Sequence, residues 1–185
     1  MKYGPKTFTD KRGDEITLRN AEPADAEAIL EFLKTTNSET RFLICEPEEI
    51  TMTVEEDREF ITRKTDSERE LLLVAFDGDE HIGNCSLMST GSSVRYRHRC
   101  SVAIALYQKY CGRGIGKVML ETVLDVARSI GCEQAELEVM TGNEGAIAMY
   151  ESIGFVKCGL LPNSTKYKDG SYSDSYWMVK DLGSR

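Results

Sequence analysis

The chain has 185 residues, of which 41% are hydrophobic and 29% charged, and its formal net charge at pH 7 is -8. This length can bury one sizeable core, so we expect a single domain over residues 1–185 that begins with a polar arm at 1–13. The acidic balance argues against general nucleic-acid binding, which depends on basic surface, and suits a cationic amine substrate. No apolar run approaches the ~20 residues that span a bilayer, so no membrane partner is expected.

Six cysteines are spread along the chain without any C-x-x-C pair, and only two histidines accompany them. A zinc site needs tighter clustering, so no metal is expected. Residues 1–13 have no apolar signal region, which favours reduced, buried thiols in a cytoplasmic protein over disulfides. His81 lies in a predicted strand, where we expect an exposed edge residue rather than a ligand.

The secondary structure follows from the spacing of apolar residues. The polar residues 1–13 predict a loose arm or an edge strand. Alternation and short apolar runs predict strands at 15–19, 70–76, 81–88, 94–106, 133–140, 155–161 and 172–179. Helical spacing predicts helices at about 24–35, 53–64, 118–130 and 144–153. Thr53 and Glu56 predict a capping box before the second helix, and Gly131 predicts a C-cap after the third.

Residues 37–52 connect the first two helices and mix apolar side chains with acidic ones. Such a segment is typical either of a substrate lid or of a solvated connection, and the sequence leaves both open.

The stretch from Tyr110 to Lys117 has glycines at alternate positions, 112, 114 and 116. It follows a predicted strand and precedes a predicted helix. Glycine permits positive φ angles and close approach of a ligand to the backbone. The first helical turn adds free N–H groups and the positive end of the helix dipole, which together favour a phosphate or pyrophosphate. The glycines do not follow the dinucleotide pattern G-x-G-x-x-G. The stretch also lacks the Lys-Ser or Lys-Thr pair that ends a P-loop.

A second block, at residues 137–155, accompanies the glycine turn, and the two together resemble the pattern of one family. Cys111 to Gly116 followed by Leu120 resembles the acyl-CoA pyrophosphate loop of the GCN5-related N-acetyltransferase (GNAT) family. Further along, the chain is similar to that family's pattern L-x-V…N-x-x-A-x-x-x-Y-x-x-x-G-F, through Leu137, Val139, Asn143, Ala146, Tyr150, Gly154 and Phe155. The order and spacing of both blocks agree, as does the element order over residues 15–180.

The resemblance implies a fold and a reaction. The fold would be α+β in three layers, with a mixed, mostly antiparallel sheet of about seven strands, splayed in the middle and flanked by about four helices. The reaction would be direct transfer of the acetyl group of acetyl-CoA to a primary amine, such as a small amine or polyamine, an amino acid or a protein N-terminus. Homodimers are common in the family, so a homodimer is a further expectation.

The resemblance also assigns roles to residues on the acetyl-CoA side. The backbone N–H groups of the turn would hold the pyrophosphate, over Cys111, Gly112, Arg113, Gly114, Ile115, Gly116 and Lys117. The strand residues Ile104, Ala105 and Leu106 would pair with the pantetheine arm, and an N–H near Leu106 would polarise the thioester carbonyl. Ala146, in the second block, would also contact acetyl-CoA.

Three of these positions have alternative interpretations. Tyr150 would donate a proton to the leaving thiolate, or it is a buried tyrosine on an apolar helix face. Asn143 would bond the pantetheine, cap the helix that begins at Glu144, or do both. Cys111 stands where the family usually has Arg or Gln. We expect Cys111 to be structural, and a covalent acyl-cysteine is the less favoured alternative.

The sequence does not single out one residue as the general base. Ser101 stands where related sequences often have a carboxylate. Glu138, Glu46, Glu48 or a water chain remain as substitutes. We therefore expect Tyr150 to matter for chemistry and no single carboxylate to be essential. A non-catalytic acyl-CoA sensor that has lost its base is the alternative function, whereas a generic nucleotide-binding protein does not explain the second block.

Overall fold

The computed structural model describes residues 1–91 and 93–183, whose centre is an eight-stranded sheet in the order β1-β2-β3-β4-β5-β6-β8-β7. The strands are β1 (Lys6–Thr9), β2 (Glu15–Asn20), β3 (Leu71–Asp77), β4 (Glu80–Ser89), β5 (Arg99–Leu106), β6 (Gln134–Met140), β7 (Val156–Lys166) and β8 (Tyr172–Asp181). The α-helices are α1 (Ala26–Glu39), α2 (Val54–Asp66), α3 (Ile115–Ser129) and α4 (Glu144–Ile153). This architecture confirms the predicted fold class, with one more strand because residues 6–9 form an edge strand rather than a loose arm.

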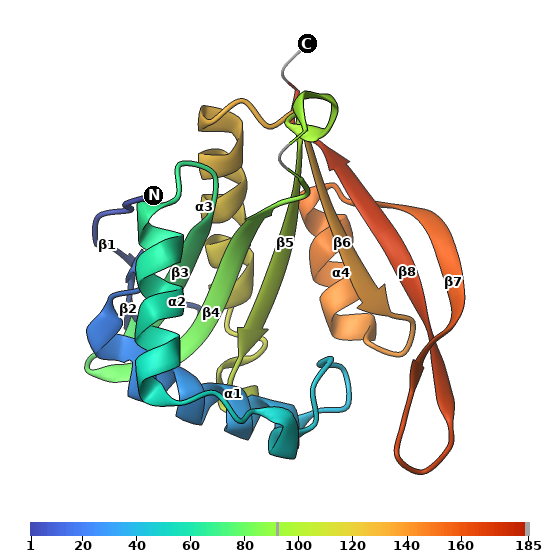
Figure 1. The fold of residues 1–185 in the computed structure, drawn as a ribbon, viewed down its shortest axis with the longest axis horizontal. Coiled ribbons are helices and arrows are strands. Elements are labelled where there is room, and N and C mark those ends of the chain that lie inside the picture. The colour runs from blue at the N-terminus through green and yellow to red at the C-terminus, as the bar shows by residue number, and fades with distance from the viewer. Residues whose placement is uncertain (92, 184–185) are drawn as a thin grey trace.

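The sheet is splayed in the middle, as predicted. β5 pairs with β4 along its length, from Ser89 opposite Cys100 to Gly83 opposite Leu106. Its parallel pairing with β6 covers only Arg99–Ser101, after which the two strands diverge (Figure 1). All other strand pairs are antiparallel. The split leaves one edge of β5 without a strand partner.

Helices cover both faces of the sheet, with α1 and α2 on one side and α3 and α4 on the other (Figure 1). Successive residues of β3 point to opposite faces, so Leu71 and Leu73 join the α3 core whereas Leu72 and Val74 join the core of α1 and α2. Because both of its faces are buried, β3 is apolar almost throughout, as its unbroken apolar run predicted.

Local signals confirm two predicted helix boundaries. The Glu56 N–H donates to Thr53 Oγ1 at 3.2 Å and the Thr53 N–H donates to Glu56 Oε2 at 2.8 Å, which is the predicted capping box. Gly131 has φ 82° and donates its N–H to the Arg128 carbonyl at 3.0 Å, closing the end of α3.

Two predictions were wrong. The strand predicted at 94–106 begins only at Arg99, and Val94–Tyr96 is a 3-10 turn, because β4 ends at Ser89 opposite Cys100 and offers no earlier pairing. His81 is buried rather than exposed, since α1 covers it and Phe32 packs edge-on at 4.9 Å between ring centroids. Burial lowers the pKa of His81, and its Nε2 lies 2.7 Å from Asn84 Oδ1.

The cysteines divide evenly between the core and the surface, and all six are free. Cys85, Cys100 and Cys132 are buried, as expected, whereas Cys45, Cys111 and Cys158 are exposed. Over the described ranges, none of the helices combines the length and the apolar character that a membrane crossing requires.

Candidate functional site

The open edge of β5 presents backbone groups toward the gap between β5 and β6. The Tyr107 N–H donates to the Ile82 carbonyl at 3.2 Å, so it points toward β4. Because backbone groups alternate along a strand, the N–H groups of Leu106 and Ile104 point the other way, into the gap. Two of the three strand residues predicted to pair with a pantetheine arm therefore present donors there, whereas the N–H of Ala105 faces β4.

The glycine turn follows β5 directly and starts α3. Gly112 has φ 76° and Gly114, the N-cap of α3, has φ 87°, so both adopt a backbone conformation that favours glycine. Over residues 1–91 and 93–183, the N–H groups of Gly112, Arg113 and Gly114 have no hydrogen-bond partner. Together with the first N–H groups of α3, they are donors that an anion could bind, and the pyrophosphate contact stays a prediction.

Gly116 has a different role, which is close packing. A Cβ atom at this position would lie 3.3 Å from Met149 Sδ and 3.4 Å from a Leu106 methyl group. The first turn of α3 therefore lies tightly against both β5 and α4. This contact brings the glycine turn, the open strand edge and the second sequence block to one place.

The second block runs from β6 into α4, and Met149 of α4 reaches the first turn of α3 beside Leu106 of β5. Asn143 is the N-cap of α4, and its Oδ1 accepts the Ala146 N–H at 3.4 Å, which confirms the capping interpretation and leaves the pantetheine contact open. Tyr150 is 8% exposed and packs edge-on against Phe155 at 5.9 Å between ring centroids. Burial, with a smaller contribution from Cys85, raises the pKa of Tyr150, so the phenol is protonated at neutral pH.

The candidate bases lie apart from one another. Glu138 is exposed on β6, on the face opposite Leu137 and Val139, as the alternation predicted. Glu46 and Glu48 form ion pairs with Lys168 of the β7–β8 turn, at 3.3 and 2.8 Å. Ser101 pairs with Glu136, whose carboxylate is already held by Arg99 at 2.7 Å.

Sequence reasoning missed Glu39, the last residue of α1. Its carboxylate accepts the Gln108 N–H at 2.8 Å, in the 3-10 turn that joins β5 to the glycine turn. Together with burial, this carboxylate raises the pKa of the Cys111 thiol. The sequence offered no signal for Glu39, because the contact joins segments that are far apart in the chain.

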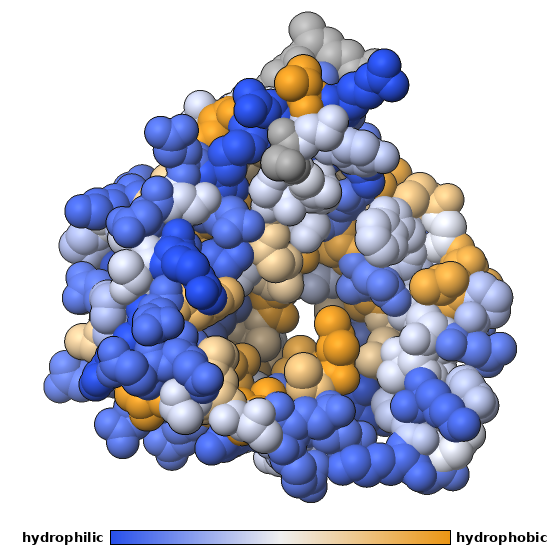
Figure 2. Space-filling view, in the orientation of Figure 1, coloured by the Kyte–Doolittle hydropathy of each residue, from blue (hydrophilic) through white to orange (hydrophobic). Residues whose placement is uncertain are grey.

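A cavity of about 500 Å³ lies between the α1–α2 connection and the β7–β8 hairpin. Its walls are residues 37–49 and 165–168, among them Arg41, Ile44, Glu46 and Tyr167. Arg41 stacks on Tyr167 at 3.8 Å from the ring centroid, and Lys168 reaches Glu46 and Glu48. Figure 2 shows an opening in the middle of the molecule, where β5 and β6 diverge, with hydrophobic residues around it.

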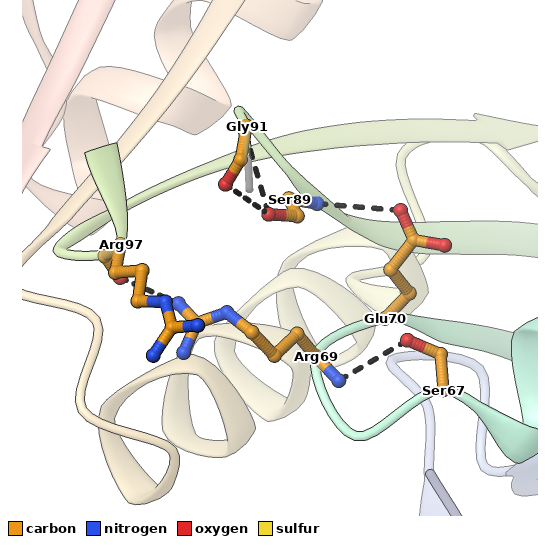
Figure 3. Close-up of a pocket in the computed structure, with 6 residues that line it drawn as sticks. All are labelled: Ser67, Arg69, Glu70, Ser89, Gly91 and Arg97. Carbon is orange, nitrogen blue, oxygen red and sulfur yellow. Dashed lines mark hydrogen bonds between the residues drawn. The ribbon is translucent and has the colours of Figure 1, made fainter. Parts of the chain in front are cut away.

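A second pocket, of about 400 Å³, lies at the opposite end of β5 (Figure 3). It is lined by Arg69, Glu70, Ser89, Gly91, Arg97 and Ser67, and the Ser89 hydroxyl donates to the Gly91 carbonyl at 3.1 Å. Because these residues precede β5 whereas the glycine turn follows it, this pocket is separate from the site above.

The fold and this arrangement define a class of protein. The sequence model of the Acetyltransferase (GNAT) family matches residues 28–155. An acetyltransferase of the GNAT family from Streptococcus pneumoniae superposes with a TM-score of 0.86 at 28% identity, over 90% of this chain and 99% of that one. A putative acetyltransferase from Salmonella typhimurium, solved with acetyl-CoA, has the same fold, with a TM-score of 0.81 at 20% identity over 92% and 95% of the two chains.

The chain is also similar to curated proteins, some of which are named as acetyltransferases. An N-alpha-acetyltransferase RimI of Mycobacterium tuberculosis is 33% identical over 59% of this chain and 65% of its own length. An uncharacterized protein of Mycobacterium leprae is 35% identical over 56% of this chain but only 27% of its own length. A putative phosphinothricin acetyltransferase of Bacillus subtilis is 27% identical over 90% of this chain and 99% of its length. The chain belongs to the GNAT acetyltransferase family.

Proposed function

We propose that this protein is an acetyl-CoA-dependent N-acetyltransferase that transfers the acetyl group directly to a primary amine. One observation carries the proposal: the glycine turn with its free N–H groups lies at the end of an unpaired β5 edge, and α4, the helix of Tyr150, packs against the same first turn of α3 through Met149. The names of two relatives support this activity: one is an N-alpha-acetyltransferase of Mycobacterium tuberculosis and the other a putative phosphinothricin acetyltransferase of Bacillus subtilis.

The donor side of the site consists of residues 104–117 and the face of α4 from Asn143 to Tyr150. The backbone from Gly112 to Lys117 would hold the pyrophosphate of acetyl-CoA, and the open edge at Ile104 and Leu106 would pair with the pantetheine arm. Bound acetyl-CoA supplies an activated acyl group as a thioester. The Leu106 N–H points into the gap where the thioester carbonyl would lie and would stabilise negative charge on its oxygen.

Tyr150 would act as the general acid. Its phenol is held in place by packing against Phe155, and burial keeps it protonated. Among the described residues no hydrogen bond contributes to its raised pKa, which leaves its O–H available to the departing sulfur. In this step the amine nitrogen forms the amide bond, the C–S bond breaks, and the thiolate takes the proton that the phenol gives up. The amine proton leaves to water, and the phenolate regains a proton from water, so Tyr150 ends the cycle as a phenol.

We propose that no single carboxylate is essential as the base. Glu46 and Glu48 form ion pairs with Lys168, and the hydrogen bond from Lys168 lowers the pKa of Glu48 below its usual value. Glu138 lies in solvent on β6. Removal of the amine proton would then fall to water in the cleft, with these acidic groups raising the local concentration of cationic substrate.

The acceptor side consists of residues 37–49 and 165–168, which surround the cavity of about 500 Å³. A cavity of this size accommodates a small amine, an amino acid or the first residues of a peptide. The names of two curated relatives fit this range, since one is called an N-alpha-acetyltransferase and the other a putative phosphinothricin acetyltransferase.

The test is a turnover screen with acetyl-CoA held at saturation and a panel of amines, beside calorimetric measurement of CoA affinity. The expected result is CoA binding together with amine-dependent release of free thiol for at least one amine class. Tight CoA binding without amine-stimulated turnover would instead support the acyl-CoA sensor. Absence of CoA binding would reject both functions.

Three further expectations stay proposals. The first is a homodimer, supported by the long edge strand β7, where Val156, Leu160 and Leu161 are exposed. Light scattering after size exclusion tests it. The second is a cytoplasmic location, with which six free thiols are compatible. The third is a single domain over residues 1–185.

A further inference from the structure

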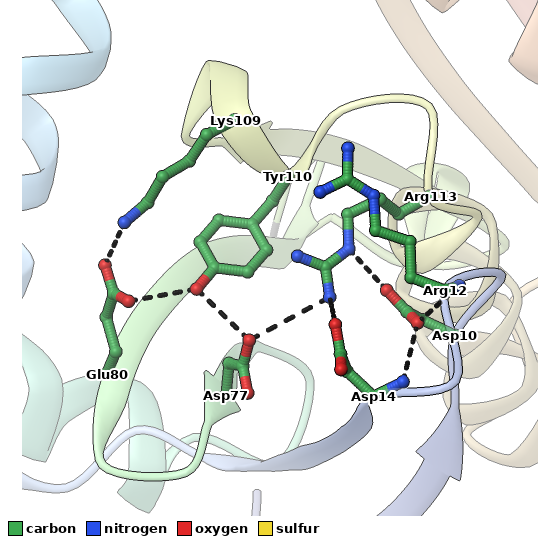
Figure 4. A network of polar contacts seen from close by, with 8 residues as sticks. All are labelled: Asp10, Arg12, Asp14, Asp77, Glu80, Lys109, Tyr110 and Arg113. Atoms are coloured by element: carbon green, nitrogen blue, oxygen red, sulfur yellow. Dashed lines mark hydrogen bonds and ion pairs between the residues drawn. The ribbon is translucent and has the colours of Figure 1, made fainter.

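The β1–β2 turn, residues 10–14, lies directly against the glycine turn. The Lys11 N–H donates to the Arg113 carbonyl at 3.1 Å. The Arg113 Nε donates to Asp10 Oδ2, and its Nη2 donates to Asp14 Oδ2 at 2.6 Å (Figure 4). The Arg113 side chain is 7% exposed and that of Asp10 is fully buried, so this contact lies in the interior.

Asp10 also organises the turn to which it belongs. Its Oδ1 accepts the N–H groups of Arg12 at 2.8 Å and Asp14 at 3.0 Å. Burial alone would raise the pKa of Asp10, but the bonds from Arg113 and from these N–H groups outweigh it and hold that pKa below its usual range. The carboxylate is therefore charged at neutral pH and shares its two oxygens between the turn and Arg113.

The glycine turn needs such an anchor. Gly112 and Gly114 have positive φ angles and no side chains, and a Cβ atom at Gly112 would meet nothing within 4 Å. Packing therefore does little to hold the backbone at Gly112. Arg113 is the one residue between these two glycines that has a side chain, and that side chain points away from the phosphate site into the β1–β2 turn.

We propose that Asp10 is a positioning residue of the donor site, which holds Arg113 and thereby fixes the N–H groups of the glycine turn for the CoA pyrophosphate. The inference rests on the proposed function. A preorganised turn binds its anion more tightly because less backbone entropy is lost on binding. The β1–β2 turn thus belongs to the donor site although it lies outside residues 28–155, the segment matched by the family.

A second hairpin turn supports the anchor from the other side. The Arg113 guanidinium stacks on the Tyr110 ring at 4.6 Å from its centroid. The Tyr110 hydroxyl donates to Glu80 at 2.9 Å and lies 3.2 Å from Asp77, both at the β3–β4 turn (Figure 4). Asp77 itself lies 3.9 Å from Arg113, so three carboxylates surround one guanidinium.

The decisive variant is Asp10→Asn, which keeps the shape of the side chain and removes its charge. We expect the dissociation constant for CoA, measured by calorimetry, to rise about tenfold, because Arg113 is left without its buried partner and the turn loosens. The KM for acetyl-CoA should rise in parallel, whereas kcat and the KM for the amine should stay within about twofold. The conservative variant Asp10→Glu should recover part of the affinity.

The matched control is Asp25→Asn. Asp25 accepts two 2.7 Å hydrogen bonds from Arg19 in a largely buried ion pair, but it lies beyond the opposite end of β2. Both variants should lower Tm, and only Asp10→Asn should weaken CoA binding. Unchanged CoA affinity in Asp10→Asn, or equal losses in both variants, would overturn the inference.

Two further measurements distinguish failure of this inference from failure of the proposed function or of folding. The unsubstituted protein is measured first, and failure of that protein to bind CoA would reject the proposed function itself. If Asp10→Asn does not fold, Asp14→Asn takes its place, because the Asp14 side chain is 51% exposed and its loss is tolerated more easily. We expect Asp14→Asn to weaken CoA binding about threefold, and no change would overturn the inference.

Discussion

The proposed donor side and the proposed acceptor side of this site are built in different ways. The donor side is packed into the core: Gly116 contacts β5 and α4 closely, Tyr150 is buried, and a buried ion pair lies behind the glycine turn. The acceptor side is held by exposed contacts between distant segments, such as Lys168 with Glu46 and Glu48. Such contacts contribute little stability. Substitutions on the two sides should therefore affect different kinetic constants, and four variants test this.

Tyr150→Phe should have the largest effect. Loss of a general acid lowers kcat by about a hundredfold or more, while the KM for acetyl-CoA and Tm change little because the ring still packs against Phe155. Initial rates with a good amine substrate measure it. An unchanged kcat would contradict the role of Tyr150 as the acid.

The pH profile gives an independent check on the same residue. Because the pKa of Tyr150 is raised, the phenol stays protonated well above neutral pH. We expect activity to show no loss from Tyr150 ionisation between pH 7 and about 10, the ordinary phenol pKa. A fall in activity within that range that disappears in Tyr150→Phe would mean that burial does not protect this proton.

Asp57→Asn should change stability while leaving both sides of the site alone. Asp57 is a buried residue of α2, its Oδ2 has no partner among the described residues, and burial raises its pKa to about 6. Below the unfolded pKa both states hold the proton, and stability falls as pH rises toward 6, where the full cost is reached. Asp57→Asn should thus raise the free energy of unfolding by about 2 kcal/mol at pH 7.

Urea unfolding at two pH values measures this effect. The gain should shrink to near zero at about pH 4, where the unfolded carboxyl begins to hold its proton. Both KM values should match those of the unsubstituted protein. A change in either KM would show that stability and the site are coupled, and it would weaken the distinction between the two sides.

Lys168→Gln tests the acceptor side. It removes two exposed ion pairs that join the β7–β8 turn to the α1–α2 connection. The KM for the amine should rise about threefold while the KM for acetyl-CoA and Tm stay the same, because exposed pairs contribute at most about 1 kcal/mol. Lys157→Gln is the matched control, since Lys157 pairs with Glu151 at 2.9 Å on the surface away from the cavity. An effect on acetyl-CoA would contradict the prediction.

The features that the sequence could predict differ from the others in the range of the contacts that create them. The fold class, the glycine turn and the capping by Asn143 depend on short-range signals, such as positive φ at glycine or a side chain that bonds its own helix, and each was found. The anchor between Asp10 and Arg113 and the contact of Glu39 with Gln108 join residues far apart in the chain. Apolar periodicity has no signal for such contacts. The wrong prediction for His81 has the same cause, because α1 covers a strand residue that looked exposed.

Cys111→Ala should have the smallest effect, although it changes the position at which the turn departs most from the family pattern. Cys111 is exposed as a residue, and its Sγ lies 3.7 Å from the Tyr107 carbonyl. Partial burial of the sulfur, together with Glu39, raises the pKa of the thiol. A raised pKa leaves little thiolate at neutral pH, and the thiolate is the nucleophile. The backbone N–H groups of the turn do not depend on this side chain. We therefore expect kcat and both KM values to stay within about twofold. Mass spectrometry of the protein after acetyl-CoA treatment without amine provides the second readout. An acetyl group on Cys111, together with loss of turnover in Cys111→Ala, would mean that the acyl group passes through the enzyme rather than directly to the amine.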